Sequence, residues 1–291
     1  MFSLFIENLR ISLSSILENK IRSILTSLGI IIGVFSVTLM GTLISGLDTS
    51  FEKSMSWLGK DILYISRFEW FSDMEWREVK NRPRIQPNYV NKIKNKSKYA
   101  LAVAPVMQRG ASLSFNDKNA RTEIFGTNQD YMETIKTDIV EGRFFTKNED
   151  LSGARVVVIG YGLKEAFFGD QNPIDEYIKI DNLKFKIIGV LAEQGKFLGL
   201  FSVDKQAILP FGSYKRMFSK RGWMRISVKV PEEYISEGLD EISTIMRHLR
   251  GLKPSQENDF AINQTKAFEK QYGALKIAIG GTGFFITFLS L

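Results

Sequence analysis

The chain has 291 residues, no cysteine, a single histidine and a formal net charge of +7. The lack of cysteine excludes disulfide bonds, thiol catalysis and metal sites with cysteine ligands. The positive surplus is spread over many residues and accompanies no nucleic-acid-binding motif, so it indicates a solvated surface and no nucleic-acid partner.

The first expected element is an amphipathic helix over residues 2–18. Its apolar residues recur at helical spacing and would form one face, opposite a polar face. The polar face comprises Ser3, Glu7, Arg10, Ser14 and Glu18. Such a helix can lie in the membrane interface, or its apolar face can pack against another protein helix. We favour the interfacial position and assign residues 1–22 to this segment.

Residues 23–47 follow without a single charge. As a helix this stretch would be roughly 37 Å long, enough to cross a hydrocarbon core of about 30 Å. A buried helix of a soluble protein rarely runs so far without a charge. A cleaved signal peptide has a shorter apolar region and a small-residue cleavage site. We therefore predict an uncleaved transmembrane helix.

Small residues form one stripe along this predicted helix, namely Thr26, Gly29, Gly33 and Ser36. Gly29 and Gly33 form a GxxxG pair, which lets a neighbouring helix approach the backbone closely. The stripe predicts a helix-packing site.

Flanking charges predict the orientation of the helix. Lys20 and Arg22 precede it, whereas Asp48 and Glu52 come before the next cations that follow it. The excess of cations on the N-terminal side places that end in the cytoplasm. Residues 48–273 would then lie outside the inner (cytoplasmic) membrane.

The pattern beyond the membrane helix predicts a two-part α+β domain. Strand, helix and strand recur near both of its ends, at 62–65, 88–98 and 101–107 and again at 223–230, 232–250 and 259–263. We expect one α+β subdomain from residues 60–109 and 211–265, containing a βαβ pattern, with residues 110–210 inserted as a β-rich subdomain. Residues 48–59 and 266–276 would be stalks.

Two segments rich in apolar and aromatic residues are candidates for contact with a partner or a substrate. They lie at residues 67–86 and 193–202, and each could instead fold back onto the domain. The candidate contact residues are Trp70, Phe71, Trp76, Phe197, Leu198, Leu200 and Phe201.

Sequence signatures of common active sites are missing. The chain contains no P-loop, GxSxG, HExxH or EF-hand motif, and His248 falls on the polar side of its predicted helix. We predict no catalytic, cofactor-binding or metal-ligating residue and do not expect an enzyme.

The middle of the domain resembles a known family. Residues 141–145 (EGRFF), Glu149-Asp150 and residues 156–160 (VVVIG) resemble its run GRxF…D…VvvIG. Further matching segments are 168–169 (FG), 172–174 (NPI), 185–191 (FKIIGVL) and 208–210 (ILP). Together with the order of the membrane segments, these motifs resemble the MacB-type, FtsX-like permeases of ABC transporters. Asp175 departs from the glycine usual in the family.

The resemblance implies a permease subunit that couples ATP hydrolysis by a partner ATPase to motion of the extracytoplasmic domain, for export or release of a substrate. ATP would bind only to the ATPase subunit. Further implied partners are a second permease copy or homologue, membrane lipid and a periplasmic adaptor. A lipoprotein-release permease and an FtsX-like regulator of cell-wall or division processes remain as alternatives.

Residues 277–291 are a second apolar run. As a helix the run would be roughly 22 Å long, shorter than a crossing requires. We therefore expect an incomplete second membrane helix, from a truncated permease gene or a fragment of one that does not support transport by itself.

Overall fold

The computed structural model describes residues 6–7, 10, 18–73, 75–197, 201–218 and 223–290. Most of the predicted amphipathic helix over residues 2–18 lies outside these residues. The chain divides into two compact units, one formed by Met1–Thr49 with Phe268–Leu291 and the other by Ser50–Ala267.

Two long helices dominate the first unit. They are α2 (Lys20–Leu58) and α10 (Lys266–Ser290), the two helices in the described part of the chain that are long and apolar enough to cross a membrane. The predicted membrane helix lies within α2, which continues without a break through the predicted stalk and ends before Gly59. Gly59 has a φ of 71°, a left-handed conformation that terminates a helix and that glycine adopts without strain.

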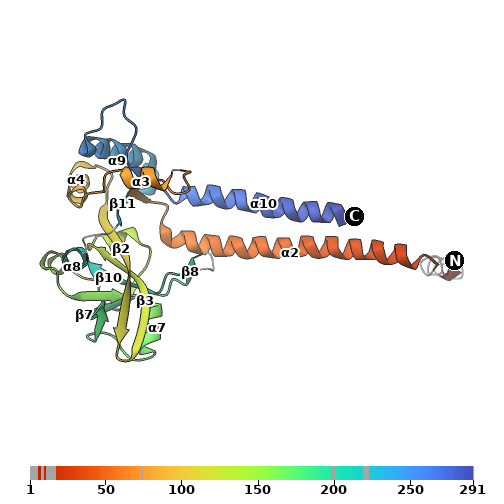
Figure 1. Ribbon diagram of the computed structural model, residues 1–291, viewed down its shortest axis with the longest axis horizontal. Coiled ribbons are helices and arrows are strands. Elements are labelled where there is room, and N and C mark those ends of the chain that lie inside the picture. Colours follow the sequence, from red (N-terminus) through yellow and green to blue (C-terminus); the bar gives the residue numbers. More distant parts are fainter. Residues whose placement is uncertain are drawn as a thin grey trace. The chain divides into compact units, whose positions relative to one another are not determined.

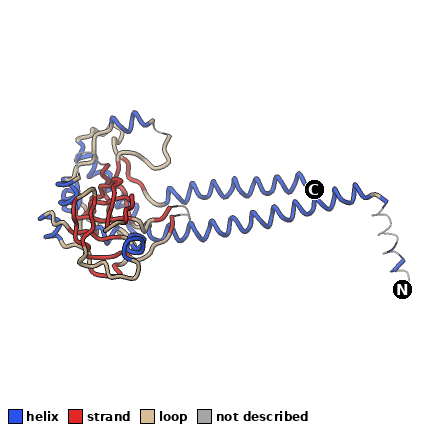
Figure 2. The backbone as a smooth tube through the Cα atoms, turned by 60° about the horizontal axis from the view of Figure 1, so that its bottom comes forward, coloured by secondary structure: helices blue, strands red, loops and turns tan. Residues whose placement is uncertain are grey.

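Helices α2 and α10 run antiparallel and side by side within this unit (Figures 1 and 2). Asp48 on α2 contacts Lys276 near the start of α10, and Gly29 near the start of α2 lies against Ser290 at the end of α10. Because Gly29 precedes Asp48 along α2 while Ser290 follows Lys276 along α10, the two helices run in opposite directions.

The second unit is a mixed α/β domain. Ten of the described strands form one sheet in the order β12-β1-β11-β2-β3-β10-β5-β7-β4, with β6 paired to β2 and β7. These strands are β1 (Ile62–Ser66), β2 (Ala102–Phe115), β3 (Lys118–Thr127), β4 (Ile139–Gly142), β5 (Val156–Ile159), β6 (Tyr177–Ile180), β7 (Leu183–Leu191), β10 (Gln206–Pro210), β11 (Trp223–Lys229) and β12 (Ala261–Asn263). A separate pair is formed by β8 (Lys196–Phe197) and β9 (Phe201–Ser202).

Helices of this unit cover both faces of the sheet and its ends. They are α3 (Trp76–Asn81), α4 (Asn88–Lys96), α5 (Tyr131–Thr134), α6 (Lys147–Ser152), α7 (Tyr161–Phe168), α8 (Phe211–Met217) and α9 (Ile235–Arg250), with a short 3-10 turn at Glu232–Tyr234. Figure 1 shows α3, α4 and α9 gathered beside β11 and the start of β2, whereas α7 and α8 lie with β3, β7 and β10.

The predicted strand–helix–strand repeat is present and its two copies interleave. β1 and β2 flank β11, and β11 and β12 flank β1, all in antiparallel contact. Each βαβ unit is therefore split by a strand of the other, an arrangement known from ferredoxin-like folds. Its two helices, α4 and α9, contact each other and contribute Ile93 and Ile242 to the larger apolar core.

Strand β2 connects this βαβ arrangement to the rest of the sheet. Its first half pairs with β11 between Ala102 and Gln108, and its second half pairs with β3 from Met107 onward. The strand thus runs through residue 110, where the sequence predicts the start of an inserted subdomain. The division into two subdomains stays a prediction.

Apolar side chains cover both faces of the sheet at the first half of β2. One core contains Val103, Ile226 and Ile242, and a smaller core on the opposite face contains Ala104, Val106 and Tyr131 of α5. The two sets alternate along β2 because successive side chains of a strand point to opposite faces.

Candidate functional site

Glycines bring the two apolar helices into close contact. A Cβ atom added to Gly29 would clash with the backbone oxygen of Ser290, and one added to Gly33 would lie 2.9 Å from Oγ of Ser290 and 3.5 Å from Cγ2 of Thr287. Gly33 is buried although most of α2 is exposed. The GxxxG pair of α2 therefore lies at its interface with α10, where small residues permit close backbone packing.

The other two residues of the predicted stripe lie differently. Thr26 is exposed and its hydroxyl donates to the carbonyl oxygen of Arg22, 2.8 Å away on the same helix. Ser36 is half-buried. α10 contributes a glycine of its own, Gly283, which lies against the side chain of Met40. The close contact is therefore made by glycines from both helices.

A polar cluster joins the opposite end of the helix pair. Nζ of Lys276 lies 2.7 and 2.9 Å from the two carboxylate oxygens of Asp48, and the hydroxyl of Tyr272 donates to the same carboxylate over 2.8 Å. The side chains of Asp48 and Lys276 are both about two-fifths exposed, at 39% and 37%. The ion pair fixes the register of the two helices at one end, and the glycines set their spacing at the other.

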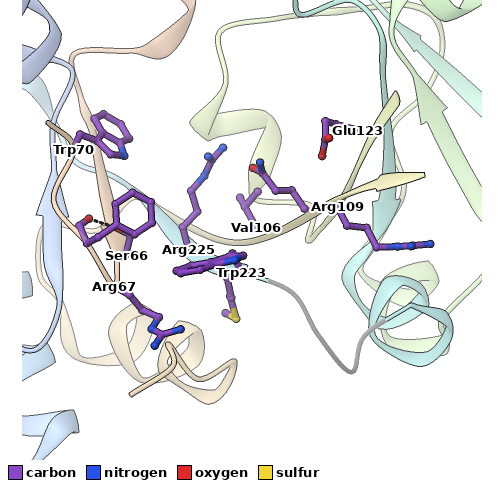
Figure 3. A pocket seen from close by; sticks show the side chains of 11 residues that line it. Ser66, Arg67, Trp70, Val106, Arg109, Glu123, Trp223 and Arg225 are labelled. Carbon is purple, nitrogen blue, oxygen red and sulfur yellow. Dashed lines mark hydrogen bonds between the residues drawn. The ribbon is translucent and has the colours of Figure 1, made fainter. Parts of the chain in front are cut away.

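A cavity of about 370 Å³ opens in the Ser50–Ala267 unit (Figure 3). Strand register places its walls, because residues directly opposite each other in an antiparallel pair share a face. Trp223 is opposite Gln108, and Arg225 is opposite Val106. The full lining is Ser66, Arg67, Phe68, Trp70, Val106, Gln108, Arg109, Glu123, Trp223, Met224 and Arg225.

Aromatic rings form much of the cavity wall. Trp223 is 40% exposed, with the ring of Phe68 edge-on at 5.8 Å and the guanidinium of Arg67 over it at 5.1 Å. The ring of Trp70 lies 5.1 Å from that of Tyr64. The ring of Trp223 thus forms part of the apolar wall and is partly exposed to solvent.

Arg225 brings a positive charge to this face of the sheet. Its guanidinium lies over the ring of Tyr64 at 5.8 Å, and its Nε is buried without a hydrogen-bond partner among the described residues. In Figure 3 its side chain extends between Ser66 and Val106, away from Trp223. The same charge opposes the effect of burial on Tyr64, which raises the pKa of that phenol well above its usual range.

The other charged groups of the lining already have partners or carry the opposite sign. Nη2 of Arg67 donates to the carbonyl oxygens of Val79 and Lys80 at the end of α3, each over 2.8 Å. Arg109 pairs with Asp181 and points away from the other labelled side chains in Figure 3. Glu123 adds one negative charge to the lining.

The aromatic segment after β1 folds back onto the domain. The backbone N–H of Trp70 donates to Oδ1 of Asn263 over 2.7 Å, and Nδ2 of the same buried Asn263 donates to the hydroxyl of Ser66 over 2.9 Å. Trp70 lines the cavity, whereas Phe71 is 53% exposed with a φ of 58°. Trp76 is the first residue of α3, and its side chain lies outside the described ones.

The second candidate contact segment is described only in part. Phe197 pairs with Phe201 in the antiparallel pair β8–β9. The structure describes the backbone of these two residues but not their side chains, and Leu198 and Leu200 are not among the described residues. Asp204 holds the base of this hairpin, since its carboxylate accepts hydrogen bonds from the N–H groups of Gln194 and Gly195 at 2.7 and 2.8 Å.

Sequence reasoning missed two central residues of the cavity, Trp223 and Arg225. The alternation over residues 223–230 predicts a buried face, and its residues are buried, namely Met224, Ile226, Val228 and Val230. A tryptophan and an arginine two residues apart in a strand share its other face, and this pattern could have indicated a site there. Among the described residues no group of three His, Asp or Glu side chains could hold a metal ion.

Comparisons with known proteins agree with one another. The family model of the MacB-like periplasmic core domain matches residues 23–243. The chain is 30% identical over 256 residues to the macrolide export ATP-binding/permease protein MacB of Bdellovibrio bacteriovorus, which covers 87% of this chain and 39% of that protein. It is 32% identical over 233 residues to the ABC transporter permease YknZ of Bacillus subtilis, covering 77% and 56%.

A third relative is the pyoverdine export ATP-binding/permease protein PvdT of Pseudomonas aeruginosa, 30% identical over 211 residues that cover 70% of this chain and 30% of that protein. The chain thus spans between 30% and 56% of the length of these relatives.

Solved structures show the same fold. The periplasmic region of MacB from Actinobacillus actinomycetemcomitans matches with a TM-score of 0.61 at 18% identity, over 74% of this chain and 93% of that one. The extracellular domain of YknZ from Gram-positive bacteria matches with a TM-score of 0.56 at 21% identity, over 69% and 98%.

Proposed function

This chain belongs to the family of the MacB-like periplasmic core domain, and we propose that it acts as a permease subunit of an ABC transporter. In this role it couples ATP hydrolysis by a partner ATPase to motion of its extracytoplasmic domain, which exports or releases a substrate. The observation that carries the proposal is the family match over residues 23–243, because it includes most of α2 as well as the domain. ATP binds to the partner subunit and not to this chain.

Two features of the chain support a mechanical role. α2 is continuous over 39 residues, and an unbroken helix transmits displacement along its axis. The glycine contacts and the Asp48–Lys276 ion pair join α2 to α10, so a displacement of one helix moves the other. Without such contacts each helix could tilt independently, and displacement of one would not move the other.

We place the protein in the inner (cytoplasmic) membrane with its N-terminus in the cytoplasm and residues 48–273 outside. The cations before α2 and the acidic residues after the apolar run support this orientation. The domain is composed of a βαβ subdomain and a β-rich subdomain. A second permease copy or homologue and a periplasmic adaptor complete the assembly. A lipoprotein-release permease and a regulatory, FtsX-like role are the alternatives.

Co-purification tests the proposed function. The full-length gene product, tagged and extracted from native membranes, should capture an ABC ATPase, and ATP hydrolysis by that subunit should change when the permease is present. Capture of cell-wall hydrolases without dependence on ATP turnover would favour the regulatory alternative. A product that associates with no ATPase would show that the transporter assignment is wrong.

Cysteine labelling tests the orientation, since the chain has no cysteine of its own. A cysteine at Asn116, in the turn between β2 and β3, should react with a membrane-impermeant maleimide in intact spheroplasts. A cysteine at Asn19 should react only after the membrane is opened. The reverse pattern would invert the topology.

Partner or substrate contact at the hairpin between residues 193 and 202 is a further part of the proposal. The double variant Phe197→Ser and Phe201→Ser should lower transport by the assembled system while leaving the thermal unfolding of the domain nearly unchanged. A large loss of stability would instead identify these side chains as part of the core.

A further inference from the structure

The cavity of the Ser50–Ala267 unit contains a positive charge that the protein does not neutralise. Arg225 forms no ion pair and no hydrogen bond through its guanidinium with the described residues, and its one aromatic contact is with Tyr64. The residue is partly buried, and its Nε is fully removed from water. Partial desolvation of a charge costs free energy unless an opposite charge compensates for it.

The neighbouring Arg67 and Arg109 also have a buried Nε without a partner among the described residues, but each has a partner for a terminal guanidinium nitrogen. Arg109 has Asp181 as its ion-pair partner. Arg67 donates to the carbonyl oxygens that end α3. Arg225 differs from both, because the groups it faces across the sheet are Val106 and the ring of Tyr64. Its donors therefore remain available to an acceptor from outside.

The walls around this charge are flat and apolar. Trp223, Phe68 and Trp70 line the cavity beside Arg225, and the cavity volume of about 370 Å³ is within the range of small-molecule sites. Aromatic faces bind planar groups by stacking. A guanidinium binds a carboxylate through two parallel hydrogen bonds.

We propose that this cavity binds a small organic monoanion with a planar apolar body, whose carboxylate pairs with Arg225 and whose body packs on Trp223 and Phe68. Glu123 sets the limit of one negative charge, because a second anionic group in the cavity would meet a carboxylate of like sign. Gln108, opposite Trp223 in the sheet, supplies an amide for a polar substituent. The inference goes beyond the proposed transport role and does not depend on it.

A pair of probes that differ by one charge tests the site. Dansylglycine carries a carboxylate on a planar aromatic body, and dansylglycinamide is its uncharged counterpart. Binding to the full chain in a non-ionic detergent is read as energy transfer from tryptophan to the dansyl group, with Trp70 and Trp223 in the lining as donors. The wild-type chain should bind dansylglycine about tenfold more tightly than the amide, as a charge-assisted hydrogen bond predicts.

Three variants locate the effect. Arg225→Gln should abolish the preference for the anion, and Trp223→Leu should weaken both probes by a similar factor. Arg155→Gln, which removes an exposed arginine that is not part of the lining, should leave the preference unchanged. Equal binding of the two probes by the wild-type chain overturns the proposal without any variant. Loss of the preference in Arg155→Gln as much as in Arg225→Gln overturns it as well, because the anion would then respond to net charge alone.

Discussion

Asp48 and Lys276 are 228 residues apart in sequence, yet both carboxylate oxygens of Asp48 lie within 2.9 Å of Nζ of Lys276. The pair joins α2 to α10 at one end of their contact, and Tyr272 adds a third hydrogen bond. Lys276 thus has a specific partner on the other helix, which couples the two apolar helices.

The first prediction tests this ion pair through a disulfide cross-link elsewhere between the same two helices. An ideal Cβ at position 283 would lie 3.3 Å from Cβ of Met40, and the Cβ atoms of a disulfide are typically about 3.8 Å apart. The double variant Met40→Cys and Gly283→Cys should therefore cross-link in this cysteine-free chain. Adding Asp48→Asn or Lys276→Gln should slow the cross-linking, because the helices lose a contact that fixes their register.

The charge-swapped background supplies the control for that experiment. Asp48→Lys combined with Lys276→Asp restores an opposite-charge pair and should recover much of the cross-linking rate. Single variants that cross-link as fast as the parent would show that the pair does not hold the helices together.

The second prediction contrasts two glycines of α2. Gly29 lies against the backbone of Ser290, whereas nothing lies within 4 Å of a Cβ added to Gly41. Gly29→Ala should destabilise the helix pair by about 1–3 kcal/mol, the usual cost of overpacking. Gly41→Ala should stabilise the helix by up to about 1 kcal/mol through its higher helix propensity.

Thermal unfolding of the chain in detergent, followed by helical circular dichroism, measures both changes. The opposite signs matter more than the magnitudes, because the two substitutions are chemically identical. Similar shifts at positions 29 and 41 would contradict close packing of α10 on this side of α2.

Local sequence patterns were sufficient for many elements of the domain. The short, wholly apolar run at residues 156–159 is typical of a buried strand, and β5 has these bounds with its last three residues buried. The hairpin between β6 and β7 has its turn at Asp181 and Asn182, whose φ values of 44° and 68° are those of the favoured two-residue turn. Such features depend on side chains near one another in sequence, so a single sequence reveals them.

Contacts between distant segments could not be predicted in the same way. The order β12-β1-β11-β2 requires strands from both ends of the domain to pair, and no local pattern specifies which edge meets which. The cavity depends on that order, because Trp70, Val106 and Trp223 come from three distant segments. Short helices such as α6 were missed because six residues carry too little periodicity, although Thr146 and Glu149 provide a capping-box signature.

The third prediction uses that capping box. Arg143 donates two hydrogen bonds of 2.8 Å to the carboxylate of Glu149, and the N–H of Thr146 donates a third of 2.8 Å. The hydrogen bonds from Arg143, and then those from Thr146, outweigh the opposing effect of burial and lower the pKa of Glu149 to about 2. A lowered pKa in the folded state means that the ionised carboxylate stabilises the fold above the unfolded pKa of 4.5.

The stabilising effect should disappear as the pH falls from 4.5 through about 2. Glu149→Gln resembles the protonated side chain, so it should be less stable than the wild type by about 1 kcal/mol at pH 6, allowing for solvent screening. The difference should be largely lost at pH 2, where the carboxyl of the folded protein is half protonated, and should vanish below that pH. Unfolding midpoints of the two proteins measured at both pH values test this, and a gap that stays constant with pH would exclude ionisation of Glu149 as its source.

The last prediction concerns the base of the β8–β9 hairpin. An isolated two-stranded pair is marginally stable in water, so this hairpin depends on what holds its ends. Asp204 is 7% exposed, and its two carboxylate oxygens accept hydrogen bonds from the N–H groups of Gln194 and Gly195. In Asp204→Asn one acceptor becomes an NH₂ donor, which leaves one of these N–H groups without its partner.

An unsatisfied buried N–H group costs about 1–3 kcal/mol, which corresponds to a rise in amide hydrogen exchange of about tenfold or more where local opening governs exchange. The amides of Gln194 and Gly195 should show this rise in Asp204→Asn, measured by mass spectrometry on peptides that span the hairpin. Glu193→Gln is the matched control, since it removes an exposed carboxylate one residue away and should leave exchange unchanged. Equal acceleration in both variants would mean that loss of negative charge, and not loss of the acceptor on Asp204, loosens the hairpin.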